Sequence, residues 1–252
     1  MKIAKRTQDR LTAGLRKYQR IVRKLAERDI SEADTVTVVK DILTDVFGYD
    51  KYLELTSEQQ IRGTFCDLAI KVDGKVHYLA EVKSAGTNLA ENHLRQAVNY
   101  GAHEGIEWVI LTNAIDWRIF RIKFGKPIDW EEVCSFDFGQ LSARSKDDME
   151  KLAMLCRENI TTDALDSFHK QAQILNRFVI AELVQSEPVL GIIRREIRKL
   201  FDGTKSTEDQ IRSILINDVI KRDALDGDGA KVAKSMVKKA VNAMARKAAK
   251  PD

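Results

Sequence analysis

The pattern of apolar and polar residues predicts a chain with two parts, one that mixes helices with strands and one that is almost wholly helical. A first helix is expected over residues 6–28. A second is expected from Ser31 to Phe47, because Ser31 is a good N-cap with Asp34 three residues later. Gly48 then suits the point at which this helix ends.

After Gly48 the periodicity changes to that of strands. The predicted elements, in chain order, are a strand over 52–60, a pair of strands over 64–72 and 75–83, a helix over 89–104, and short strands over 108–111 and 117–123. Asp73 and Gly74 separate the paired strands, and Asp-Gly is one of the strongest hairpin signals in a sequence.

From Ser145 onward the pattern is nearly all helical, with apolar residues at helical spacing at Met149, Leu152, Ala153 and Cys156. The sequence therefore predicts three regions. These are a basic N-terminal helix over 1–28, an α/β core over 29–142, and a helical domain over 143–252 that ends in a basic helix.

Composition narrows the class of protein. Of the 252 residues, 44% are hydrophobic and 32% charged, which is ordinary for a soluble globular protein. No apolar run approaches the roughly 18 residues needed to span a bilayer, and no signal-peptide stretch follows the basic start. We therefore expect a cytoplasmic protein with no membrane partner. Cys66, Cys134 and Cys156 are widely spaced, which predicts reduced, partly buried thiols rather than disulfides or a zinc site.

The net charge of +4 is small, but basic residues gather at both ends of the chain. Residues 2–28 carry ten Lys or Arg against two acids, and residues 231–250 carry seven and no acid. Both ends could touch phosphates through an electrostatic attraction that does not depend on base sequence. Alternatively, they are solvated helix faces, and for either end alone this interpretation is at least as good.

Candidate chemistry lies on the predicted hairpin. Glu81 and Lys83 are two residues apart on one strand and so share a face, and Asp67 on the partner strand can reach the same place. Two carboxylates can hold a hard divalent cation such as Mg²⁺, and a lysine can position water and stabilise charge on a phosphate. Taken alone, Glu-x-Lys on a strand is usually explained by an ordinary amphipathic strand whose solvent-exposed face carries salt bridges.

Two further features add to this pattern. Glu32 lies on the same helical stripe as Val36 and Val39, and an acid on a core-facing stripe is unusual without a partner. The alternative is that it complements the helix dipole at the N-terminus. Gln96 and Tyr100 stand one turn apart on the 89–104 helix, where they could hydrogen-bond a nucleotide or the catalytic groups, or fill surface.

The order of these residues resembles the PD-(D/E)xK nuclease superfamily, and most of all the N-terminal nuclease domain of type I restriction enzyme R subunits. The likeness covers about residues 28–125. Besides Glu32, it is carried by the phrases Leu43-Thr44-Asp45-Val46-Phe47-Gly48-Tyr49, Arg62-Gly63-Thr64-Phe65-Cys66-Asp67, Ala80-Glu81-Val82-Lys83, Gln96-Ala97-Val98-Asn99-Tyr100, and Leu111-Thr112-Asn113 followed by Trp117-Arg118.

The resemblance implies a three-layer, restriction-endonuclease-like α/β core with a central mixed sheet, followed here by the all-helical region. It implies Asp67, Glu81 and the backbone carbonyl of Val82 as ligands of Mg²⁺, with Mn²⁺ as a substitute. Lys83 becomes the catalytic lysine and Glu32 an accessory acid near the metal. The implied substrate is DNA, and RNA stays open.

Gln96 and Tyr100 match the QxxxY element that part of the superfamily uses to hold DNA or the active-site strands. Cys66 replaces the proline of the name motif, a position that varies widely. Residues 203–206, Gly-Thr-Lys-Ser, end like a P-loop but lack its other glycines. No nucleotide cofactor is therefore expected, and the chain cannot by itself be an ATP-driven translocating subunit.

Two other functions stay open from sequence. The same fold could hold nucleic acid or a protein without cutting, although two carboxylates would repel a phosphate unless a metal intervenes. Alternatively, the C-terminal helices could carry a scaffold function. Their amphipathic stripes, which include Leu165 and Phe168, also leave a homo-oligomer open.

Overall fold

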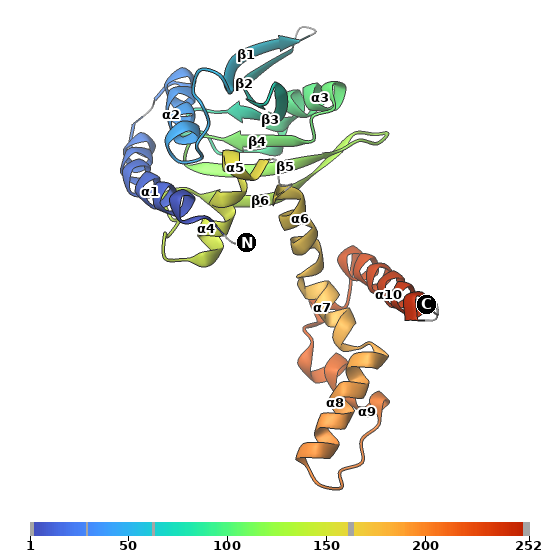
Figure 1. Ribbon diagram of the computed structural model, residues 1–252. Helices are drawn as coiled ribbons and strands as arrows, with labels where there is room; N and C mark the ends of the chain where they lie inside the picture. Colours follow the sequence, from blue (N-terminus) through green and yellow to red (C-terminus); the bar gives the residue numbers. More distant parts are fainter. Residues whose placement is uncertain (1–2, 29, 62–63, 161–163, 249–252) are drawn as a thin grey trace. The chain divides into compact units, whose positions relative to one another are not determined.

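The computed structural model describes residues 3–28, 30–61, 64–160 and 164–248 (Figure 1). In chain order the elements are α1 (Lys5–Ala26), α2 (Glu32–Asp45), β1 (Leu55–Ile61), β2 (Thr64–Val72), β3 (Lys75–Val82), η1 (Glu91–Leu94), α3 (Arg95–Glu104), β4 (Trp108–Thr112), β5 (Asp116–Lys123), β6 (Asp129–Asp137), α4 (Lys146–Met154), α5 (Arg157–Ile160), α6 (Ala164–Ile174), α7 (Arg177–Val184), α8 (Glu187–Leu200), α9 (Glu208–Ile214), η2 (Leu215–Val219), η3 (Arg222–Ala224) and α10 (Asp228–Ala248). Three parts of the sequence predictions lie outside the described residues. They are residues 1–2 of the basic start, Arg62 and Gly63 of the motif that ends at Asp67, and residues 249–250 of the basic C-terminal helix.

The six strands form one sheet in the order β1-β2-β3-β4-β5-β6. Neighbouring strands are antiparallel except for β3 and β4, which are parallel and are connected through η1 and α3. The sheet is therefore mixed. Asp73 and Gly74 both have positive φ, 51° and 79°, as a type I′ turn requires, so the predicted β2–β3 hairpin is confirmed.

Helices cover both faces of this sheet. One apolar cluster joins α1, α2, α4 and α5 to one face, around the fully buried Trp117. The Trp117 ring meets Phe47 edge-on at 5.6 Å and stacks on Phe136 at 6.2 Å. A second cluster packs α3 against the other face, on side chains such as Leu79 and Val109. An α/β architecture with a central mixed sheet is thus confirmed.

Most predicted elements form close to their expected bounds. The Ser31 hydroxyl caps α2 by accepting a hydrogen bond from the Asp34 N–H at 3.2 Å. The strand expected at 52 begins only at Leu55, because the Asp50 carboxylate accepts hydrogen bonds from the Tyr52 and Leu53 N–H groups, both at 2.8 Å, and holds a turn there. The helix expected from residue 89 begins later, as a 3₁₀ turn that leads into α3.

The sequence pattern did not predict strand β6. A bulge between Ile119 and Phe120 shifts the register of its pairing with β5. Its own alternation is also interrupted by Glu131 and Glu132, whose carboxylates pair with Lys and Arg side chains of β5. Pairing with a neighbouring strand, rather than local periodicity, therefore defines β6.

The chain forms two compact units, Met1–His169 and Lys170–Asp252. The boundary between them therefore lies at residues 169–170 and not at 142–143, where the sequence pattern placed it. Helix α4, grouped by sequence with the helical region, buries Met149 and Leu152 in the core of the first unit. Helix α1, expected as a region of its own, packs in the same core.

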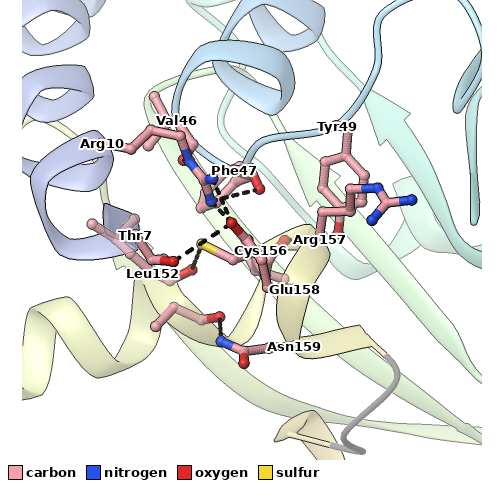
Figure 2. Close-up of polar contacts among 12 residues, drawn as sticks. Thr7, Arg10, Val46, Phe47, Tyr49, Leu152, Cys156, Arg157, Glu158 and Asn159 are labelled. Carbon is pink, nitrogen blue, oxygen red and sulfur yellow. Dashed lines mark hydrogen bonds and ion pairs between the residues drawn. The ribbon is translucent and has the colours of Figure 1, made fainter. Parts of the chain in front are cut away.

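Arg10 links α1 to two other elements of the first unit. Its guanidinium donates hydrogen bonds to the carbonyls of Val46 and Phe47, at 2.9 and 3.2 Å, and pairs with Glu158 at 2.5 Å (Figure 2). The Tyr49 hydroxyl donates to the Leu155 carbonyl at 2.7 Å. These polar contacts fasten the ends of α2 and α4 to each other and to α1.

The second unit has a much smaller core. Val179 of α7 packs against Ala233 and Val237 of α10, with Phe178 and Leu183 partly buried beside them. No helix among the described residues is both long and apolar enough to cross a membrane.

Candidate active site

The carboxyl end of β3 carries the first two candidate residues. Glu81 is almost fully buried, with 6% of its surface exposed. The Lys83 N–H donates to the Thr112 carbonyl at 2.9 Å, so the pairing of β3 with β4 continues through this lysine. The Lys83 ammonium contacts Glu81 Oε1 at 2.7 Å. The structure therefore brings Glu81 and Lys83 together, as their spacing in the strand predicts.

Asp67 enters the site from the neighbouring strand, β2. The β2–β3 pairing sets Leu68 opposite Ala80, and the Asp67 carboxylate accepts a hydrogen bond from the Val82 N–H at 2.7 Å. This bond fixes the carboxylate next to the backbone that carries Glu81. Asp67 therefore lies where the predicted hairpin would place it.

Glu32, the first residue of α2, is the third acid. Its Oε2 lies 3.5 Å from the Lys83 ammonium, and 49% of its side chain is exposed. The lysine thus bridges Glu81 on the sheet and Glu32 on the helix. This contact supplies the partner that an acid on a core-facing stripe requires.

The electrostatics of the site are dominated by burial and by the excess of acids. Burial raises the pKa of Glu81, and the negative charges of Asp67 and Glu32 raise it further, against the lowering effect of its hydrogen bond to Lys83. Burial acts to lower the pKa of Lys83, but the hydrogen bond to Glu81 and the charges of the three acids outweigh it and raise that pKa. The lysine is therefore held as an ammonium among three carboxyl groups.

The donor set fits a hard divalent cation. Asp67 and Glu81 supply carboxylate oxygens from adjacent strands, the Val82 carbonyl directly follows Glu81 in sequence, and one ammonium leaves negative charge in excess. Within the described residues, no group of three or more His, Cys, Asp or Glu side chains is arranged to hold a metal. The candidate ligands of the site are the Asp67 and Glu81 carboxylates and the Val82 backbone carbonyl.

Gln96 and Tyr100 lie on α3, the helix that covers the other face of the sheet. Gln96 is exposed, whereas Tyr100 is 3% exposed and belongs to the core cluster that includes Cys66 and Leu79. Burial raises the pKa of Tyr100, with smaller contributions from Glu104 and Cys66. Tyr100 is therefore a core residue rather than a surface residue, and its ring supports the strands of the site by packing.

Asn113 is a residue of the site region to which the sequence assigned no role. It is 3% exposed and follows β4, and its amide donates to the carbonyls of Thr87 and Ala85, at 3.0 and 3.4 Å. Its side-chain oxygen accepts from the Asp116 N–H at 2.7 Å. Asn113 therefore fastens the loop that follows Lys83, and a polar amide directly after a buried strand was the signal for it.

The chain was compared with protein families, curated proteins and solved structures. No family model, no curated protein and no solved structure matches it. The chemistry proposed below therefore depends on the positions of Glu32, Asp67, Glu81 and Lys83 themselves.

Proposed function

We propose that the protein is a metal-dependent nuclease that hydrolyses DNA phosphodiester bonds on a restriction-endonuclease-like PD-(D/E)xK core. The observation that carries this proposal is the buried Glu81, hydrogen-bonded to the ammonium of Lys83 and beside Asp67, at the end of the central strands. A mixed sheet with helices on both faces agrees with the layered architecture of such a core.

Asp67, Glu81 and the Val82 carbonyl would hold Mg²⁺, with Mn²⁺ as a substitute. When bound, such an ion polarises the phosphate and lowers the pKa of a water molecule. The protein contributes orientation. The Val82 N–H holds the Asp67 carboxylate in one position, and burial of Glu81 limits its access to water.

Lys83 supplies positive charge where the phosphate gains negative charge during hydrolysis. Its two contacts, to Glu81 at 2.7 Å and to Glu32 at 3.5 Å, come from a strand and from a helix. The ammonium is thus oriented by two separate elements, which is the pre-organisation that electrostatic stabilisation of a transition state requires. Glu32, half exposed beside it, acts as the accessory acid.

The test is cleavage of supercoiled plasmid and linear DNA by the purified full chain, with Mg²⁺, Mn²⁺ or EDTA. We expect cutting that requires metal and that falls at least about 100-fold in Lys83→Ala. Lys75→Ala is the matched control, because Lys75 is an exposed lysine at the opposite end of the same strand. This control should cut at the wild-type rate.

Full cleavage by Lys83→Ala would remove the assigned role of the lysine. Absence of cutting by the wild-type chain in both metals, with DNA still retarded in a gel, would instead support a binding module that does not cut. Nicked plasmid would indicate an endonuclease, and progressive shortening of linear DNA an exonuclease.

A further inference from the structure

The exposed side of α1 carries a row of cations. Arg16, Arg20 and Lys24, which we call the basic row, follow one another at intervals of four residues, and all three are exposed. Four residues of helix rise about 6 Å, so the row presents three cations over about 12 Å. The opposite side of α1 buries Leu11 and Leu15 in the core, so the row is not needed to pack the helix.

Within the described part of the chain, no acid neutralises the charges of the basic row. Among the described residues, none of its three side chains forms an ion pair, whereas Arg10 and Lys17 on the same helix pair with acids. Like charges four residues apart destabilise a helix by a few tenths of a kcal/mol per pair. An external anion that binds the row would offset this repulsion.

The carboxyl-terminal half of α1 lies at the same end of the sheet as the candidate active site. The Gln19 amide donates to the Leu141 carbonyl at 2.6 Å, and Arg23 donates to the Gly139 carbonyl at 3.4 Å. Both carbonyls follow β6, which runs in the same direction as β3 because two antiparallel pairings and one parallel pairing separate them. Lys83 follows β3. Three strand spacings, about 14 Å, therefore separate Lys83 from the carbonyls after β6 across the sheet.

We propose that the basic row is a phosphate anchor that holds the backbone of duplex DNA beside the active site. This inference rests on the proposed function for its substrate. Duplex DNA presents one negative charge per about 1.7 Å of its axis, so phosphates reach both the row and Lys83 in one bound molecule. Without a metal the active site has an excess of acids and repels phosphate, so cations elsewhere on the surface would supply the affinity that is measured in EDTA.

The experiment measures binding without cutting. The full chain is titrated into a fluorescently labelled duplex in EDTA, at several salt concentrations, and compared with the triple variant Arg16→Gln, Arg20→Gln, Lys24→Gln. We expect the affinity near 0.1 M salt to fall at least about 10-fold. The slope of log K against log salt should become shallower by about 3, because each lost phosphate contact removes about 0.9.

The matched control removes three charges elsewhere, in Lys75→Gln, Lys126→Gln, Lys205→Gln, three exposed lysines outside the row. Its affinity and slope should stay close to wild type. All six side chains are exposed, and thermal melting of both variants checks that they fold. An equal loss in the control, or an unchanged slope in the row variant, would overturn the anchor.

The two proposals fail in different ways. If the wild-type chain cuts DNA while the row variant binds and cuts as well as wild type, the anchor is wrong and the nuclease stands. If the salt slope of the row variant shows the loss of about three phosphate contacts while the wild-type chain never cuts DNA, the anchor stands and the nuclease proposal is wrong.

Discussion

The two units of the chain differ in how completely they bury their apolar residues. In Met1–His169, two clusters cover both faces of a six-stranded sheet, whereas the core of Lys170–Asp252 centres on Val179, Ala233 and Val237. Among the residues whose exposure is described, four of the exposed large hydrophobic side chains lie in the first unit and 13 in the second. The first unit therefore buries a far larger apolar core than the second.

Charge follows the same division. Residues 1–169 carry 25 Lys and Arg against 27 Asp and Glu, and residues 170–252 carry 17 against 11. The net positive charge of the chain therefore comes from the second unit, and the basic row of α1 is a local feature in an otherwise acidic first unit. The exposed apolar side chains of the C-terminal helices leave self-association through these helices as a proposal.

Trp117→Ala gives the largest expected effect on stability. The ring is fully buried between Phe47 and Phe136, and its indole N–H donates to the Ala114 carbonyl at 3.1 Å. Its removal leaves a cavity and an unpaired carbonyl, and should cost about 3–5 kcal/mol of unfolding free energy. Calorimetry should show the transition of the first unit moved to lower temperature.

The transition of the second unit serves as the internal control for Trp117→Ala. It should keep its wild-type temperature, because the core of the second unit is a separate cluster around Val179, Ala233 and Val237. A single transition that moves as a whole would show that the two units unfold together, and the comparison between them would then fail.

The parts of the first unit that sequence predicted are those set by local rules. Ser31 caps α2, Asp73 and Gly74 form the hairpin turn, and Glu81 and Lys83 meet because residues two apart in a strand share a face. These features need only neighbours in the chain.

Features set by distant contacts were harder to predict. Strand β6 exists through its pairing with β5, and α4 belongs to the first unit because it buries Met149 and Leu152 against elements more than a hundred residues earlier. The sequence indicated that Glu32, an acid on an apolar stripe, needs a partner, but it did not identify Lys83 as that partner. The role of Asn113 depends on a loop that it touches from another strand, so periodicity could not reveal it.

Two helical glycines test the difference in packing directly. A Cβ on Gly14 would lie 2.7 Å from Cγ2 of the fully buried Val46, and a Cβ on Gly229 would lie 2.7 Å from the ring of Phe178. Val46 has no room to move, so Gly14→Ala should cost about 1–3 kcal/mol. Phe178 is only partly buried and can turn away, so Gly229→Ala should be close to neutral, helped by the helix propensity of alanine.

Chemical denaturation of the two glycine variants, in which the transition of each unit is followed separately, measures both effects. Gly14→Ala should lower the midpoint of the first unit only. An equal cost for Gly229→Ala would show that the second unit is packed as tightly as the first, in spite of its exposed apolar side chains.

The smallest expected effect concerns the ion pair that joins α1 to α5. The hydrogen bond from Arg10 lowers the pKa of Glu158 below its ordinary value. A carboxylate with a lowered pKa contributes stability that is present above its unfolded pKa, about 4.3, and is lost as the pH falls through the folded pKa. Because 43% of the Glu158 side chain is exposed, solvent screens the pair, and Glu158→Gln should cost about 1 kcal/mol or less at pH 7.

This cost should shrink as the pH falls from 7 through the lowered folded pKa of Glu158, and below that pKa wild type and Glu158→Gln should unfold at the same denaturant concentration. The matched control is Asp223→Asn in the second unit, whose pair with Arg177 is 2.7 Å long but about 60% exposed on both sides. It should leave the stability unchanged throughout this pH range. A difference for Glu158→Gln that stays constant as the pH falls from 7 into the acid range would show that the side chain acts through packing around Arg10 rather than through its charge.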